Sequence, residues 1–80
     1  MTIDPDRATP VYLQLAAILE ERIRSGELPA GRIIPSENTL IGEFGIARET
    51  VRKAVNVLRE RELVVTVHGR GTFVAEDLDT

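Results

Sequence analysis

Residues 35–60, PSENTLIGEFGIARETVRKAVNVLRE, decide the fold of this chain. Ser36 is typical of a helix N-cap, Glu37 suits the first turn of a helix, and Gly45 is typical of a helix end. A second helical pattern starts almost at once, at Ala47. Two short helices joined by a tight, glycine-containing turn predict a helix-turn-helix, whose second helix is free to lie in the major groove of a duplex.

The second helix is expected to run from about Ala47 to Glu60. One face of it is apolar, because Val51, Ala54, Val55 and Leu58 recur at three- and four-residue spacing. The opposite face is polar and carries Arg48, Glu49, Arg52, Lys53, Asn56 and Arg59. The pattern therefore predicts a helix with one buried side and one exposed, largely basic side.

Toward the amino terminus, apolar residues recur with helical spacing between Val11 and Ile23. Thr9 suits the N-cap of this helix, Pro10 its first position, and Gly26 its end. Residues 32–34 form a short β candidate, and residues 1–8 lack periodicity, which predicts a flexible lead.

Toward the carboxy terminus, the β-branched and aromatic runs 64–67 and 72–74 are joined by residues 68–71, whose glycines suit a hairpin turn. The order of elements predicts an α+β, mainly helical winged helix-turn-helix over residues 9–75, with three helices and a small antiparallel sheet as the wing. Tyr12 and Phe73 are expected in its core. Residues 76–80 are interpreted as a tail or the start of a linker.

The composition excludes several classes of protein. The 80 residues have room for one hydrophobic core, and without cysteine they form neither a disulfide framework nor a thiolate metal site. A single histidine, His68, does not make a zinc centre, and no catalytic constellation is present. No membrane span or signal peptide is evident, which predicts a cytoplasmic protein. We therefore expect no enzyme activity, no cofactor, no metal and no membrane partner.

The charge is unevenly distributed. The net charge of −3 argues at first against a nucleic-acid partner, but residues 48–70 carry +3 between two segments of −3. A local basic block is what a nucleic-acid-binding surface requires, although it also describes an arginine-rich, solvated helix face.

Five blocks of sequence, in order and with close spacing, resemble the DNA-binding domain of GntR-family bacterial transcription regulators. They are PVYLQ (10–14), GELPAG (26–31), PSE (35–37), FGIARETVRKA (44–54) and GRGTFV (69–74). The resemblance implies a domain that binds a palindromic operator in double-stranded DNA as a homodimer and acts most often as a repressor. It also implies that a small-molecule effector binds a separate carboxy-terminal domain, which these residues do not contain.

The resemblance also implies the DNA-binding residues. In the helix, Arg48 and Arg52 are expected to contact guanine or phosphates in the major groove, with Glu49, Thr50 and Lys53 beside them. For Glu49 a purely dipole-favourable role at the helix start remains open, and for Thr50 a bond within the helix. The wing tip, His68, Gly69 and Arg70, is expected in the minor groove. Ser36 and Asn38 complete the predicted set.

Two positions depart from the family pattern. Ala47 stands where the family commonly has a serine or threonine that caps the second helix, and Asn38 stands where it often has arginine. The alternative function that the residues leave open is a winged helix that binds another protein without reading DNA.

Overall fold

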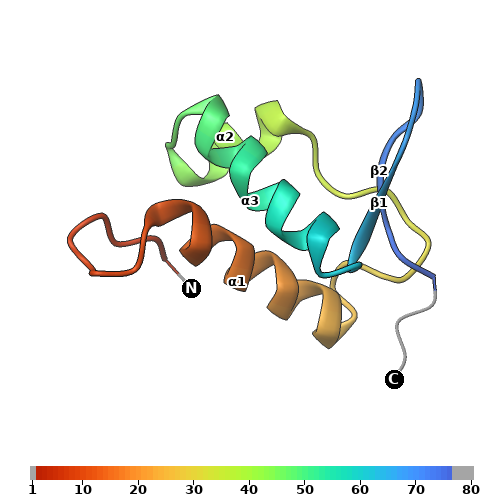
Figure 1. Ribbon diagram of the computed structural model, residues 1–80, viewed down its shortest axis with the longest axis horizontal. Coiled ribbons are helices and arrows are strands. Elements are labelled where there is room, and N and C mark those ends of the chain that lie inside the picture. The colour runs from red at the N-terminus through yellow and green to blue at the C-terminus, as the bar shows by residue number, and fades with distance from the viewer. Residues whose placement is uncertain (1, 77–80) are drawn as a thin grey trace.

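The computed structural model describes residues 2–76 of the chain. It contains three helices, α1 (Val11–Ser25), α2 (Glu37–Phe44) and α3 (Arg48–Glu60), followed by the strands β1 (Val64–Val67) and β2 (Gly71–Val74). As Figure 1 shows, α1 and α3 lie side by side, α2 packs near the start of α3, and the hairpin projects at the far end of α3. The predicted winged helix-turn-helix is confirmed; the predicted tail, apart from Glu76, lies outside the described residues.

The helix ends are set by local chemistry. The Ser36 hydroxyl accepts the Thr39 N–H at 3.1 Å, and Gly45 adopts a left-handed φ of 66°, so both predicted ends of α2 are confirmed. Ala47 occupies the N-cap of α3 without a side-chain bond, as its methyl group requires. The predicted N-cap of α1 is wrong by one residue: Pro10, with an extended ψ of 147°, is the cap instead of Thr9.

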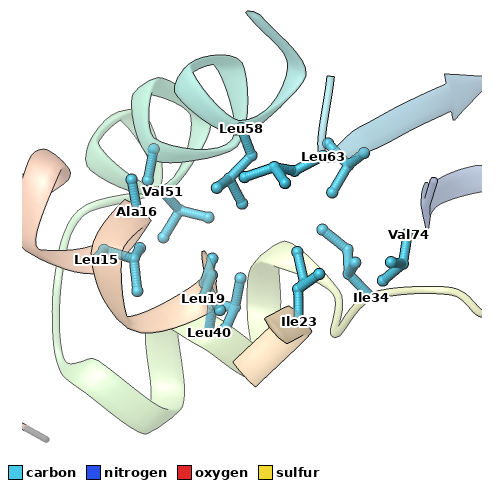
Figure 2. Packing of buried hydrophobic residues seen from close by; sticks show 12 residues of the cluster. Leu15, Ala16, Leu19, Ile23, Ile34, Leu40, Val51, Leu58, Leu63 and Val74 are labelled. Atoms are coloured by element: carbon cyan, nitrogen blue, oxygen red, sulfur yellow. The ribbon is translucent and has the colours of Figure 1, made fainter. Parts of the chain in front are cut away.

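The core is aliphatic and draws on every element. Its largest fully buried members are Leu15, Leu19, Leu40, Val51, Leu58, Val64 and Val74, and most of them are labelled in Figure 2. Tyr12 is half-buried against this cluster, as expected. Phe73 was expected in the core, but it is only half-buried and lies outside the cluster. Its partner across the hairpin is the exposed Val65, so both lie on the outer face of the sheet.

The sheet is a two-stranded antiparallel hairpin in which Val64 pairs with Val74 and Thr66 with Thr72. The short β candidate at residues 32–34 forms one isolated bridge, between Ile33 and Phe73. Because a two-stranded hairpin is marginally stable on its own, the wing depends on contacts at its base and on its inner face.

The lead before α1 is tied to the domain by a buried side chain. Gln14 is 4% exposed, and its amide nitrogen donates to the carbonyls of Asp4 (2.8 Å) and Thr9 (2.7 Å). Its amide oxygen accepts the Asp4 N–H at 2.9 Å. These bonds satisfy the buried amide, and the flexibility of residues 1–8 stays a prediction.

The turn between α3 and the wing contains a residue with left-handed backbone. Glu62 has a φ of 62°, and the N–H of Leu63 donates to the Leu58 carbonyl at 2.9 Å. The Glu62 N–H donates to the Arg59 carbonyl at 3.0 Å, which completes a Schellman ending. Glycine is the residue that adopts this conformation without strain, so Glu62 holds it at a conformational cost.

Replacing Glu62 with glycine is expected to raise the free energy of unfolding by about 0.5 to 1 kcal/mol, because glycine relieves the left-handed strain. Urea denaturation followed by circular dichroism measures the change. Glu62→Ala is the matched control, since alanine also removes the charge but keeps a Cβ atom in the strained position. Equal stabilisation by both variants would show that charge, not backbone strain, is responsible.

Candidate nucleic-acid interface

The beginnings of α2 and α3 meet in a polar cluster, which we call the arginine cluster and define as Glu37, Asn38, Arg48 and Arg52. The Glu37 carboxylate accepts from Arg48 Nη1 at 2.8 Å and from Arg52 Nε at 3.0 Å. Arg48 Nη2 also donates to the Asn38 amide oxygen at 2.6 Å. One carboxylate thus orients two arginines that lie one turn apart on the exposed face of α3.

The electrostatics of the arginine cluster favour the ionised carboxylate. Hydrogen bonds from Arg52 and Arg48 lower the pKa of Glu37, and the bond to Glu37 raises the pKa of Arg52. Two guanidinium groups share one carboxylate, so the cluster keeps a net positive charge. The side chains of Arg48 and Arg52 are 48% and 57% exposed, which leaves them accessible to an anionic partner.

The two arginines differ in the donors that they leave free. Arg52 uses only Nε within the described part of the chain, so its two terminal nitrogens remain available as a parallel pair. Arg48 instead commits one bond from each terminal nitrogen to α2. Since a parallel pair of N–H groups matches the O6 and N7 acceptors of guanine, Arg52 has the better geometry for bidentate base recognition.

Ser36, Glu49 and Thr50, which were also predicted to contact DNA, lie beside the arginine cluster at the starts of α2 and α3. The Ser36 hydroxyl donates its proton to Thr39 Oγ1 at 2.9 Å. The amide oxygen of Asn38 accepts from Arg48, which leaves the amide N–H groups of Asn38 as donors. Glu49 is exposed in the first turn of α3, and Thr50 is half-buried.

Two members of the basic block face away from the arginine cluster. The Lys53 ammonium lies 5.8 Å from the centroid of the Tyr12 ring, on the side of α3 that meets α1. Arg61 Nη1 donates to Glu20 on α1 at 2.9 Å. The basic block is therefore divided between the exposed face of α3 and its contact with α1, which charge counting along the sequence did not anticipate.

The wing tip places His68, Gly69 and Arg70 in solvent at the end of the hairpin. The Arg70 N–H closes the turn on the Val67 carbonyl at 2.9 Å, with Gly69 at a φ of 79°. The Arg70 guanidinium lies 5.7 Å from the centroid of the Phe73 ring. The tip is thus an exposed turn that carries one cation, and its contact with the minor groove stays a prediction.

A groove separates the arginine cluster from the wing. It has a volume of about 480 Å³ and is floored by apolar side chains that include Ile34, Leu40 and Val55. Arg52 lies at its α3 edge and Thr72 at its wing edge. Of the predicted wing tip, only Gly71 lines the groove, which therefore lies between the arginine cluster and the part of the wing nearer to α3.

Sequence reasoning missed one set of polar residues beside this groove. Arg59 Nε and Nη2 donate to the Thr66 hydroxyl at 3.1 and 2.8 Å, which links α3 to β1. Alternation along the strands could have placed Thr66 and Thr72 on one face of the hairpin. No sequence pattern, however, indicates that this face turns toward Arg59.

Within residues 2–76, no helix is long and apolar enough to cross a membrane. In the same residues, no three histidine, cysteine or acidic side chains gather in a way that could hold a metal ion.

Comparison with known proteins identifies related sequences. The family model described as "Bacterial regulatory proteins, gntR family" matches residues 11–74. The mannosyl-D-glycerate transport/metabolism system repressor MngR of Escherichia coli K12 is 41% identical over 85% of this chain. The HTH-type transcriptional repressor NagR of Bacillus subtilis is 38% identical over 95% of it. The aligned parts are 28% and 31% of those relatives, so the chain spans about three tenths of their length.

Solved structures share both the fold and part of the sequence. The chain superimposes on the AraR DNA-binding domain in complex with operator ORR3 with a TM-score of 0.81 and 35% identity, covering 94% of this chain and 90% of that one. It superimposes on YtrA from Sulfolobus acidocaldarius, a GntR-family transcription factor, with a TM-score of 0.86 and 35% identity, covering 96% and 81% of the two chains.

Proposed function

This chain belongs to the gntR family of bacterial regulatory proteins and carries the winged-helix DNA-binding domain of a transcription regulator, and on that premise we propose how it binds its operator. In this proposal α3 lies in the major groove, with Arg48 and Arg52 reading base edges or phosphates. The wing tip, residues 68–71, lies in the neighbouring minor groove. Regulation of transcription, rather than enzyme catalysis, is the activity of the family.

The observation that carries this proposal is the arginine cluster. Glu37 holds the two α3 arginines in defined orientations before any ligand binds, and such preorganisation reduces the entropy lost on binding. The wing tip stands on the far side of the groove, so a duplex lying across both would present its major groove to α3 and its minor groove to the wing.

The other predicted contacts form the edge of this interface. We propose that Ser36 and Asn38, at the start of α2, meet a phosphate through the free N–H groups of Asn38 and the exposed α2 amino terminus. Glu49 and Thr50 flank Arg48 in the first turn of α3. Lys53, which lies toward Tyr12, is proposed as a contact at the flank of the duplex.

The regulatory assembly is a further part of the proposal. Two copies bind the half-sites of a palindrome, which supplies affinity that one small interface lacks. The relatives named above are repressors, so we propose repression, controlled by an effector that binds outside residues 2–76. We place this activity in the cytoplasm, where bacterial DNA lies.

Selection from a pool of random duplexes by the immobilised chain tests direct DNA readout. The expected result is one enriched sequence, and a palindrome would support the dimeric arrangement. Absence of any enriched duplex would favour the alternative, a winged helix that binds another protein.

The affinity for the selected duplex is expected to fall steeply with salt. With about four to six phosphate contacts per domain, the logarithm of the association constant should change with the logarithm of salt concentration with a slope between about −3.5 and −5.5. Fluorescence anisotropy at several KCl concentrations measures the slope. A slope near zero would contradict binding through the phosphate backbone.

A further inference from the structure

The two strands of the wing are held differently: residues 31–34 form backbone hydrogen bonds with β2, from Ile34 N–H to the Thr72 carbonyl at 2.9 Å among others, whereas β1 faces α3. At the base, Leu63, Val64 and Val74 are buried in the core. Beyond the base, residues 65–71 are exposed, and the isolated bridge to Ile33 lies on the edge formed by β2. The polar contact between the outer half of β1 and α3 is made by Arg59 and Thr66. This contact therefore restrains the wing from the side of α3, where the backbone bonds to residues 31–34 do not reach.

The hydrogen-bond geometry makes this contact directional. Arg59 Nε and Nη2 both donate to Thr66 Oγ1, which uses the two lone pairs of that oxygen. The single Thr66 hydroxyl proton is then free to donate to Thr72 Oγ1, which lies 3.2 Å away. Because Thr66 and Thr72 are paired in register, one guanidinium is connected to both strands of the wing.

The guanidinium of Arg59 is also oriented from its own helix. Arg59 Nη1 donates to the Asn56 amide oxygen, one turn earlier on α3. Asn56, Arg59 and Thr72 all line the groove between α3 and the wing. Within residues 2–76, no carboxylate lies close enough to form an ion pair with Arg59. In the same residues, its side chain is hydrogen-bonded to Asn56 on α3 and to Thr66 on the wing.

We propose that Arg59 is a positioning residue, which acts through Thr66 to hold the wing at the angle that its tip needs in the minor groove while α3 occupies the major groove. This proposal rests on the proposed function. A positioning role differs in a testable way from a direct contact between Arg59 and a phosphate. If Arg59 positions the wing, its effect on binding depends on the uncharged hydroxyl of Thr66; if Arg59 contacts a phosphate, it does not.

Thr66→Val is the sharpest test, because valine keeps the β-branched shape and suits a strand but removes the hydroxyl. The probe is the duplex that the unaltered chain selects from the random pool. Thr66→Val is expected to weaken binding by about threefold to tenfold, the usual size of the loss of a typical solvent-exposed hydrogen bond. The salt slope should not change, since no charge is removed.

Chemical footprints distinguish the two parts of the interface. Protection from hydroxyl radicals in the minor groove next to the wing should be lost in Thr66→Val. Protection of guanine N7 from dimethyl sulfate by α3 should remain. Arg59→Met should give the same pattern, and the double variant should bind no more weakly than Arg59→Met, because the two side chains act as one unit.

Arg61→Met is the matched control for Arg59→Met. It removes the same charge two residues further along, from a side chain that pairs with Glu20 on α1 instead of with the wing. The minor-groove footprint should survive in this variant. Loss of that footprint in Arg61→Met as well would overturn the assignment to Arg59.

The proposal is overturned if Thr66→Val binds as tightly as the unaltered chain, whether or not Arg59→Met weakens binding. In particular, normal binding by Thr66→Val together with a salt slope reduced by about one in Arg59→Met would identify Arg59 as a direct phosphate contact. Equal loss of both footprints would indicate general damage to the domain and would also overturn it.

A measurement without DNA keeps the proposal testable if no duplex is selected, which would be a failure of the proposed function itself. Residual dipolar couplings of the backbone amides compare the orientation of residues 67–71 with that of α3. These couplings are expected to change in Thr66→Val and Arg59→Met but not in Arg61→Met. Unchanged couplings in the first two variants would show that Arg59 does not position the wing.

Discussion

Arg52→Ala is expected to weaken binding of the selected duplex by about 1 to 3 kcal/mol, which is about 5-fold to 150-fold in the dissociation constant. The physical reason is the parallel pair of terminal N–H groups that Arg52 keeps free while Glu37 holds its Nε. Arg48→Ala is expected to fall in the same range. Anisotropy titrations at constant salt measure both losses, and loss of discrimination at one base pair would identify the base that Arg52 reads.

Arg61→Ala provides the control for this prediction. It makes the same change in net charge and in side-chain size, but Arg61 lies at the end of α3 and pairs with Glu20. Its effect on DNA affinity should be small. If Arg52→Ala and Arg61→Ala weaken binding equally, the effect is one of overall charge. If Arg52→Ala folds normally and binds normally, the assignment of Arg52 is wrong.

Leu58→Ala is expected to lower the free energy of unfolding by about 2 to 5 kcal/mol, because it leaves a cavity in the core. Leu58 is 0% exposed and belongs to the same core cluster as Leu19 and Val51. In a domain of this size a single core supplies only about 3 to 5 kcal/mol, so this one substitution should remove most of the stability. Urea denaturation of the purified chain measures the loss.

Leu13→Ala is the matched control for Leu58→Ala. It makes the same chemical change in α1, at a half-buried position outside the core cluster. Its expected cost is below about 1 kcal/mol, and the higher helix propensity of alanine offsets part of that. Similar losses for the two variants would contradict the view that stability is concentrated in the core cluster.

Much of the fold could be predicted because its signals are local. Ser36 and Gly45 mark the ends of α2 through their own side chain and backbone, without help from distant residues. The misplaced N-cap of α1 shows the limit of such signals. Thr9 and Pro10 are both compatible with the start of a helix. The Thr9 carbonyl accepts a hydrogen bond from the buried side-chain amide of Gln14, and the first backbone N–H groups of α1 donate to the Pro10 carbonyl instead.

The candidate site could be predicted only in part. The helical period places Arg48 and Arg52 on one face, but it does not reveal that Glu37, on another helix, would orient both. Lys53 and Arg61 belong to the same basic block in the sequence, yet they turn toward α1. Arg59 was predicted on the exposed face but given no role, because its partner Thr66 is uncharged and lies on a different element.

The net charge of −3 also illustrates what the sequence determines and what only the tertiary structure determines. The sequence alone determines how this charge is distributed along the chain. It also determines the order of the elements and the apolar faces of the helices, because each depends on residues a few positions apart. The arginine cluster, the groove and the link from Arg59 to the wing join segments that are distant along the chain. They exist because the aliphatic core packs α2, α3 and the wing at particular angles. Those angles determine which charged side chains are exposed to a DNA partner and which contact another helix.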